Sequence, residues 1–137
     1  YSGNLENATI ENLDELYQVN TRAPYFLTHG LVELLKMCKG RIVFINSTAG
    51  LDSWKSIGQY AASKHALSAI AGSFQAELEN YGIKITSVYP AATNTPMQKK
   101  IHESEGKTFN PDTLLPAEEV ADITVDLLWR TSKSVVS

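Results

Sequence analysis

Two apolar runs on either side of a helical segment place the strongest constraint on how this chain folds. The runs are Arg41–Asn46 and Ile83–Tyr89, and the first is rich in β-branched residues without alternation of polar and apolar side chains. Such a strand is buried on both faces, as in a parallel sheet. Between the runs, Gln59–Asn80 has apolar residues at helical spacing. The order strand, helix, strand predicts a right-handed parallel crossover.

A second helical pattern precedes this unit. Apolar residues recur three or four apart over Thr9–Met37, which predicts a long helix closed by Lys39-Gly40, with Gly40 as the cap residue. Pro24 interrupts the pattern, because it has no N–H to bond the carbonyl oxygen of Asn20. We therefore expect a kink at Asn20 and a free backbone oxygen there.

The remaining segments are a polar loop at 47–58, a long segment at 91–115 and a final helix at 116–130. The segment 91–115 is polar and is expected to be irregular, as in a lid or a binding loop. Pro116 and the acidic residues after it suit the first turn of the last helix. The chain is thus expected to be one α/β domain spanning 1–137, in the order α-β-α-β-loop-α.

Composition excludes several classes of partner. The 137 residues carry a formal net charge of -3, so neither nucleic acid nor a membrane surface is expected as a partner. The lone Cys38 cannot form an internal disulfide and fits a reducing compartment. The three histidines lack metal-ligand spacing, so no metal is expected. No segment resembles a signal peptide or a bilayer span, and the expected location is cytoplasmic.

The strongest chemical signal is the pair Tyr60 and Lys64 near the start of the second helix. Their separation of four residues puts both side chains on one helix face. A tyrosine hydroxyl ionises near pH ~10 and is a poor acid at neutral pH, but a nearby ammonium favours its ionised form. Alone, such a pair is more often an exposed surface pair. Ser47, however, directly follows the first strand, and chemistry gathers at the carboxyl ends of strands in doubly wound sheets.

With Asn20, these three residues resemble the Asn-Ser-Tyr-Lys tetrad of the short-chain dehydrogenase/reductase family. Ser47 and Tyr60 are 13 residues apart and Asn20 and Ser47 are 27 apart, as is typical of that family. Ile45-Asn46-Ser47-Thr48-Ala49-Gly50 and Tyr60-Ala61-Ala62-Ser63-Lys64 resemble its motifs, in order. The resemblance implies a partial doubly wound, Rossmann-like parallel sheet that lacks the family's first four strands.

The resemblance also implies roles for the tetrad. Tyr60 would be the general acid/base on the substrate oxygen, and Ser47 would position that oxygen. Lys64 would favour ionisation of Tyr60 and hold the ribose of the nicotinamide cofactor, NAD or NADP. The backbone carbonyl of Asn20 would fix a water linking Lys64 to solvent. The implied activity is interconversion of a small-molecule alcohol and a ketone or aldehyde by hydride transfer.

Further cofactor contacts are expected after the second strand. The family usually has Pro-Gly there, whereas this chain has Pro90-Ala91, and the added methyl group bears on how closely a cofactor can approach. Thr93 and Thr95 match family residues that contact the nicotinamide carboxamide. The alternative is that both threonines serve only as turn and helix-cap hydroxyls.

Two expectations concern what the 137 residues lack. They contain no Gly-rich turn to cradle a pyrophosphate, so they are expected to be the catalytic part of a larger enzyme, with no tight cofactor binding and no activity alone. The unpaired edge of strand 41–46 favours association. We expect a homo-oligomer formed through helices 9–37 and 59–80, which resemble the family's dimer faces.

Two alternative functions remain open from the sequence. A nucleotide-sugar epimerase or dehydratase also uses a Tyr-Lys pair, although the tetrad spacing and the segment 90–95 argue against it. The other alternative is a non-catalytic scaffold or truncation product that keeps the fold and binds no cofactor.

Overall fold

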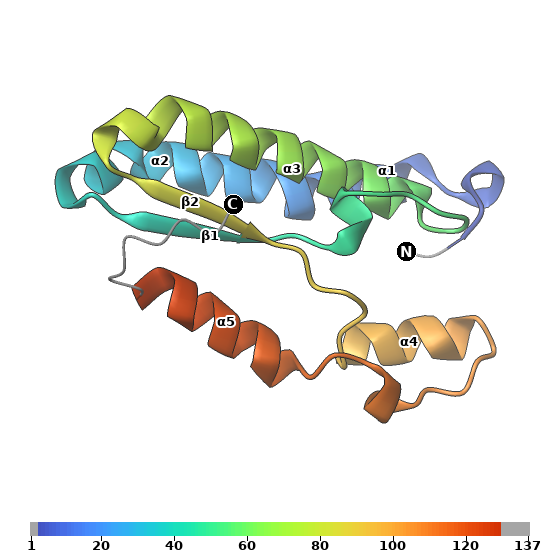
Figure 1. Ribbon diagram of the computed structural model, residues 1–137. Coiled ribbons are helices and arrows are strands. Elements are labelled where there is room, and N and C mark those ends of the chain that lie inside the picture. The colour runs from blue at the N-terminus through green and yellow to red at the C-terminus, as the bar shows by residue number, and fades with distance from the viewer. Residues whose placement is uncertain (1–2, 130–137) are drawn as a thin grey trace.

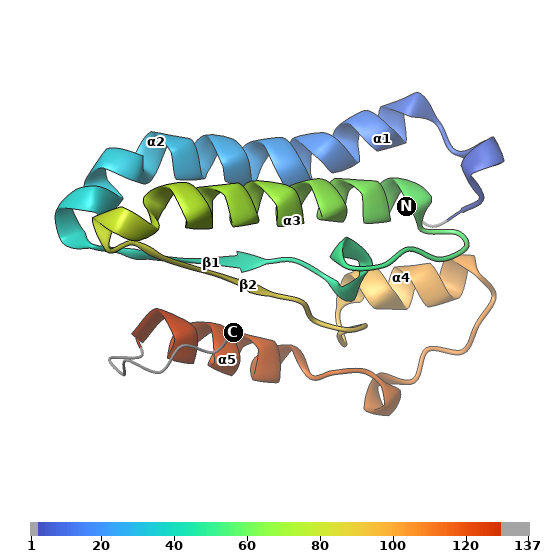
Figure 2. The ribbon, with the colours of Figure 1, turned by 45° about the horizontal axis from the view of Figure 1, so that its top comes forward.

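The computed structural model describes residues 3–129 as helices layered on a small parallel sheet. Helices α1, α2 and α3 lie together on one side of the two strands and α5 lies on the other side, while α4 lies beyond the carboxyl end of β2 (Figures 1 and 2). The longer elements are α1 (Ile10–Tyr17), α2 (Ala23–Cys38), β1 (Arg41–Ile45), α3 (Gly58–Leu78), β2 (Lys84–Val88), α4 (Pro96–Ser104) and α5 (Ala117–Trp129). The short turns are η1 (Leu5–Asn7), η2 (Gln18–Arg22), η3 (Thr48–Gly50), η4 (Glu79–Tyr81) and η5 (Pro111–Thr113).

The predicted parallel crossover is confirmed. Strand β1 pairs with β2 in parallel, in a register from Arg41 opposite Lys84 to Ile45 opposite Val88. The pairing continues past the strand ends, because the N–H of Asn46 donates to the carbonyl oxygen of Val88 at 2.8 Å. The two chains therefore leave the sheet side by side, at the edge where the predicted site residues begin.

One apolar cluster joins α3 to the sheet. It comprises Phe44, Leu67, Ala71, Phe74, Leu78, Ile83 and Ile85, and Ile70 packs against it in a partly buried position. The predicted apolar side of this helix thus faces the core. Small residues bring the helix close to its neighbours, since Ala61 and Ala71 are almost fully buried.

The interruption predicted in the first long helix is observed as a π-helical turn, η2, between α1 and α2. Pro24 lies within the first turn of α2, where its missing N–H is tolerated. Such π-bulges occur frequently at functional sites.

The expected role of Gly40 as the cap was wrong, because the left-handed cap residue is Lys39, with φ 51°. Gly40 follows Lys39 because a side chain would not fit at this position. A Cβ on Gly40 would lie 2.6 Å from Cδ2 of Leu35.

The expectation of an irregular segment at 91–115 was also wrong. The segment contains α4 and η5. Helix α4 begins at Pro96 after Thr95, whose hydroxyl accepts a hydrogen bond from the N–H of Gln98 at 3.3 Å. No residue of α4 is buried. The helix therefore follows from local capping rather than from an apolar face, which is why hydrophobic periodicity did not indicate it.

Helix α5 covers the other face of the sheet. Arg41 donates from Nη1 to the carbonyl oxygen of Leu127 at 3.1 Å, which ties β1 to this helix. The helix begins one residue later than expected, and the expected end at Arg130 lies outside the described residues. No helix within 3–129 combines the length and the apolar content needed to cross a membrane.

Candidate active site

Tyr60 and Lys64 lie in the first two turns of α3, on one face, as their spacing predicts. The Nζ atom of Lys64 is 5.8 Å from the centre of the Tyr60 ring. Both side chains are half-buried, so each combines packing with access to solvent. The helix thus presents a phenol and an ammonium to the same space.

The ammonium of Lys64 is directed at the end of β1. Its Nζ donates to the carbonyl oxygen of Ile45 at 3.3 Å. Burial lowers the pKa of Lys64 from its ordinary value of 10.5. The unfolded chain binds this proton more tightly, so the charge on Lys64 opposes folding at neutral pH. That penalty fades as the pH rises through the lowered pKa toward 10.5.

Ser47 follows β1 directly and begins η3. Its backbone is extended, with φ -165° and ψ 156°, and its Oγ accepts a hydrogen bond from the N–H of Ala49 at 3.2 Å. Within the described residues no acceptor takes the hydroxyl proton of Ser47. Turn η3 packs against α3, which brings the serine toward the helix that carries Tyr60.

Asn20 is tied to the same turn of α3 through Ser63. Nδ2 of Asn20 donates to Oγ of Ser63 at 3.1 Å, and that Oγ donates to the carbonyl oxygen of Tyr60 at 2.8 Å. The neighbouring Thr21 donates from Oγ1 to the carbonyl oxygen of Ser63 at 3.0 Å. The π-helical turn is therefore fixed against the Tyr60–Lys64 turn. Ser63 is fully buried, with 0% of its surface exposed.

The predicted cofactor residues after β2 lie along one stretch of chain. The carbonyl oxygen of Pro90 accepts from the N–H of Thr48 at 3.1 Å, which joins Pro90 to the turn that follows Ser47. Thr93 donates to the carbonyl oxygen of Ala91 at 2.8 Å, and Thr95 caps α4. Both threonine hydroxyls thus have the turn and cap contacts of the alternative interpretation.

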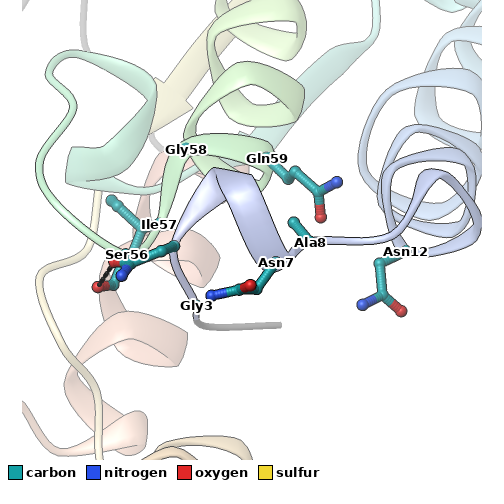
Figure 3. Close-up of a pocket in the computed structure, with 9 residues that line it drawn as sticks. Gly3, Asn7, Ala8, Asn12, Ser56, Ile57, Gly58 and Gln59 are labelled. Atoms are coloured by element: carbon teal, nitrogen blue, oxygen red, sulfur yellow. Dashed lines mark hydrogen bonds between the residues drawn. The ribbon is translucent and has the colours of Figure 1, made fainter.

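A separate hollow lies between η1 and the starts of α1 and α3 (Figure 3). Its volume is about 210 Å³, and it is lined by Gly3, Asn4, Asn7, Ala8, Asn12, Ser56, Ile57, Gly58 and Gln59. None of the predicted site residues lines it. Among residues 3–129, no group of three or more His, Cys, Asp or Glu side chains is arranged to hold a metal ion.

Sequence reasoning missed the buried polar residues that support the site. Ser63 was quoted only as part of a motif, and Asn46 and Ser68 were given no role. Asn46 is 4% exposed, and its Nδ2 donates to the carbonyl oxygen of Lys64 and to Oγ of Ser68. A signal was present for Asn46, which is a polar residue at the end of a run that the sequence predicts to be buried. Ser68 is only partly buried, and no signal pointed to it.

Replacing Gly50 with alanine should lower the free energy of unfolding by about 1–3 kcal/mol. A Cβ at this buried position would lie 2.6 Å from Oδ1 of Asn46 and 3.0 Å from the carbonyl oxygen of Lys64. Urea unfolding measures the loss. The matched control is Gly72→Ala within α3, where a Cβ meets no atom within 4 Å and should add about 0.5–1 kcal/mol. Equal effects at both glycines would contradict the steric argument.

The parallel strands and their helical crossover agree with a family comparison. The sequence profile described as short chain dehydrogenase matches residues 2–106. The chain belongs to the short-chain dehydrogenase family. Its relatives there are oxidoreductases. One of them, an uncharacterized oxidoreductase of Staphylococcus epidermidis, is 32% identical over 132 residues, an alignment that includes 96% of this chain.

Two further proteins are similar to this chain, one in sequence and one in fold. The NADPH-dependent 3-dehydrocapnine reductase of Ornithobacterium rhinotracheale is 35% identical over 98 residues, which cover 68% of this chain and 35% of that protein. The solved structure of ElxO with NADP bound has a TM-score of 0.85 and 22% identity, covering 98% of this chain and 58% of that one. The fold is thus the Rossmann-like fold of the family. The chain spans about half the length of its S. epidermidis relative, 55%.

Proposed function

We propose that this chain carries the proton-transfer centre of an NAD(P)-dependent oxidoreductase that interconverts an alcohol and a ketone or aldehyde. The observation that carries the proposal is the common face of Tyr60 and Lys64, with the ammonium bonded at the end of the strand that leads into Ser47. In the proposed site, a proton donor, a cation and a hydroxyl would lie around one strand end. Membership of an oxidoreductase family and an NADP-bound structural neighbour support it.

Each tetrad residue has a distinct role in the proposed reaction. Tyr60 gives a proton to the substrate oxygen during reduction and takes it back during oxidation. Ser47 donates its free hydroxyl proton to the same oxygen and positions it. The backbone carbonyl of Asn20 holds a water that links Lys64 to solvent. Pro24, four residues later, has no N–H to donate to this carbonyl.

The residues also fit a nicotinamide cofactor, which when bound supplies or accepts the hydride. An ammonium has three N–H groups, and the Ile45 carbonyl oxygen takes one of those on Lys64, so two remain for the ribose and for the water that Asn20 holds. Tyr60, Pro90, Thr93 and Thr95 are the other proposed contacts. The methyl group of Ala91, which is exposed, stands where the family usually has glycine.

The 137 residues hold no Gly-rich turn for the pyrophosphate, so we propose that they bind the cofactor weakly and are inactive by themselves. A fluorescence titration of the chain with NADH and NADPH tests this, and tight binding would contradict it. The activity is tested by joining the chain to a dinucleotide-binding half and following oxidation of NADPH with a panel of ketones and aldehydes. No turnover with any carbonyl compound, in a protein that binds NADPH, would overturn the proposed function.

We also propose that the chain forms a homo-oligomer through the helices α1, α2 and α3. Helix α2 exposes large apolar side chains, including Phe26 at 75% and Met37 at 83%. Helix α3 exposes small residues that permit close helix packing, namely Ala62, Ala69, Gly72, Ser73 and Ala76. Sedimentation velocity measures the assembly, and a folded monomer at high concentration would contradict it.

The remaining proposals concern location and excluded partners. The one cysteine, Cys38, is free and exposed, which supports a cytoplasmic location. The net charge of -3 supports the absence of nucleic-acid and membrane-surface partners.

A further inference from the structure

A buried amide connects the end of β1 to the helix that carries Tyr60 and Lys64. The Nδ2 atom of Asn46 donates to the carbonyl oxygen of Lys64 at 3.2 Å and to Oγ of Ser68 at 2.8 Å. Oγ of Ser68 in turn donates to the carbonyl oxygen of Gly50 at 2.9 Å. Asn46 and Gly50 stand on either side of Ser47 in sequence, so the helix is bonded to the chain both before and after this serine.

Asn46 is an unfavourable residue for packing alone. Its Oδ1 is buried and has no hydrogen-bond partner in the described part of the chain. A buried amide with one unpaired atom is less stable than an apolar side chain of the same shape. The contribution of the Asn46 side chain is therefore its two hydrogen bonds from Nδ2, and both acceptors lie on α3.

Lys64 is held at two points by consecutive residues of one strand end. Its backbone oxygen accepts from Asn46, and its Nζ donates to the carbonyl oxygen of Ile45 at 3.3 Å. The direction of the ammonium thus depends on how closely the second turn of α3 lies against this strand end. The bond from Asn46 sets that approach without touching any reacting atom.

We propose that Asn46, assisted by Ser68, is a positioning residue that fixes the separation between Ser47 and the Tyr60–Lys64 turn. This inference deepens the proposed function and rests on it. Without the bonds from Nδ2, the strand end and the helix separate, and water reaches the ammonium of Lys64. The fold itself persists, because the apolar cluster between α3 and the sheet is unchanged.

The test follows the titration of Lys64 by NMR in the 137-residue chain, using lysine labelled with ¹³C at Cε and assigned with Lys64→Arg. In Asn46→Ala the midpoint of the Lys64 titration should rise by about half a pH unit or more, because the ammonium becomes better hydrated. Ser68→Ala should give a smaller rise. The matched control is Ser73→Ala, an exposed serine on the same helix, which should give none.

The outcomes separate positioning from a purely structural role. A structural role lowers the urea midpoint and leaves the Lys64 titration of the folded variant unchanged, and that result would overturn the inference. If Asn46→Ala does not fold, Asn46→Leu decides, since it keeps nearly the same shape and loses both bonds from Nδ2. The titration requires no turnover. A shift at Lys64, together with no carbonyl reduction by the protein that joins this chain to a dinucleotide-binding half, would therefore count against the proposed function and not against the positioning.

Discussion

Replacing Tyr60 with phenylalanine should lower the turnover of a protein that joins this chain to a dinucleotide-binding half by about 10²–10⁴-fold, the usual contribution of a general acid. The change removes one oxygen atom and keeps the ring that packs in the first turn of α3. The Tyr60 hydroxyl has no hydrogen bond to another described residue, so no internal bond is lost. Steady-state oxidation of NADPH with a carbonyl substrate measures the effect.

The control for this variant is Tyr81→Phe. Tyr81 is 51% exposed, and its ring contacts the ammonium of Lys36 at 4.3 Å, a contact that phenylalanine keeps. Both variants should unfold within about 0.5 kcal/mol of the parent chain. Turnover retained in Tyr60→Phe would remove this residue from the acid/base role, whereas turnover lost in both would indicate a general effect of losing a tyrosine hydroxyl.

Replacing Phe44 with alanine should lower the free energy of unfolding by about 3–5 kcal/mol. Phe44 is 5% exposed near the carboxyl end of β1 and packs in the apolar cluster that includes Leu67 and Phe74. Its loss leaves a cavity between the strand and α3. Since domains of this size are stable by about 5–15 kcal/mol, the change removes a large share of the total. The midpoint of urea unfolding measures it, with the slope unchanged.

The control is a phenylalanine on the surface. Phe26 is 75% exposed on α2, so Phe26→Ala should change the stability of the dilute chain by no more than about 0.5 kcal/mol. Comparable losses at Phe44 and Phe26 would show that α2 is buried by association even in dilute solution. A small loss at Phe44 would contradict the described core.

The elements that hydrophobic patterning specifies were predicted from the sequence. Apolar patterning predicted α3 and the first strand, so Arg41–Asn46 and Gln59–Asn80 were predicted to within two residues of the observed ends. The expectation that the first strand is buried on both faces was wrong, because Phe44 is the one buried residue of β1 and Ile45 is 44% exposed. Tyr60 and Lys64 were placed together because helical geometry alone fixes residues four apart. The interruption of the first long helix was predicted from the missing N–H of Pro24, which is a local property.

The elements that depend on other forces could not be predicted in the same way. Helix α4 buries none of its residues and begins at a cap formed by Thr95, so its apolar pattern is absent. The bonds of Asn46 and Ser63 join segments far apart in the chain, and no spacing rule relates their partners. The roles assigned to Asn20, Ser47, Tyr60 and Lys64 all stay predictions.

The segment after β2 is closed at its base by a short bridge. Thr93 pairs with Leu115, and the N–H of Asn94 donates to the carbonyl oxygen of Leu115 at 2.8 Å. Residues between these points, including α4, can lengthen or change at a low entropic cost, since the ends of the loop are already joined. The sequence of this segment can therefore diverge during evolution while Ser47, at the end of β1, and the helix that carries Tyr60 and Lys64 stay in place.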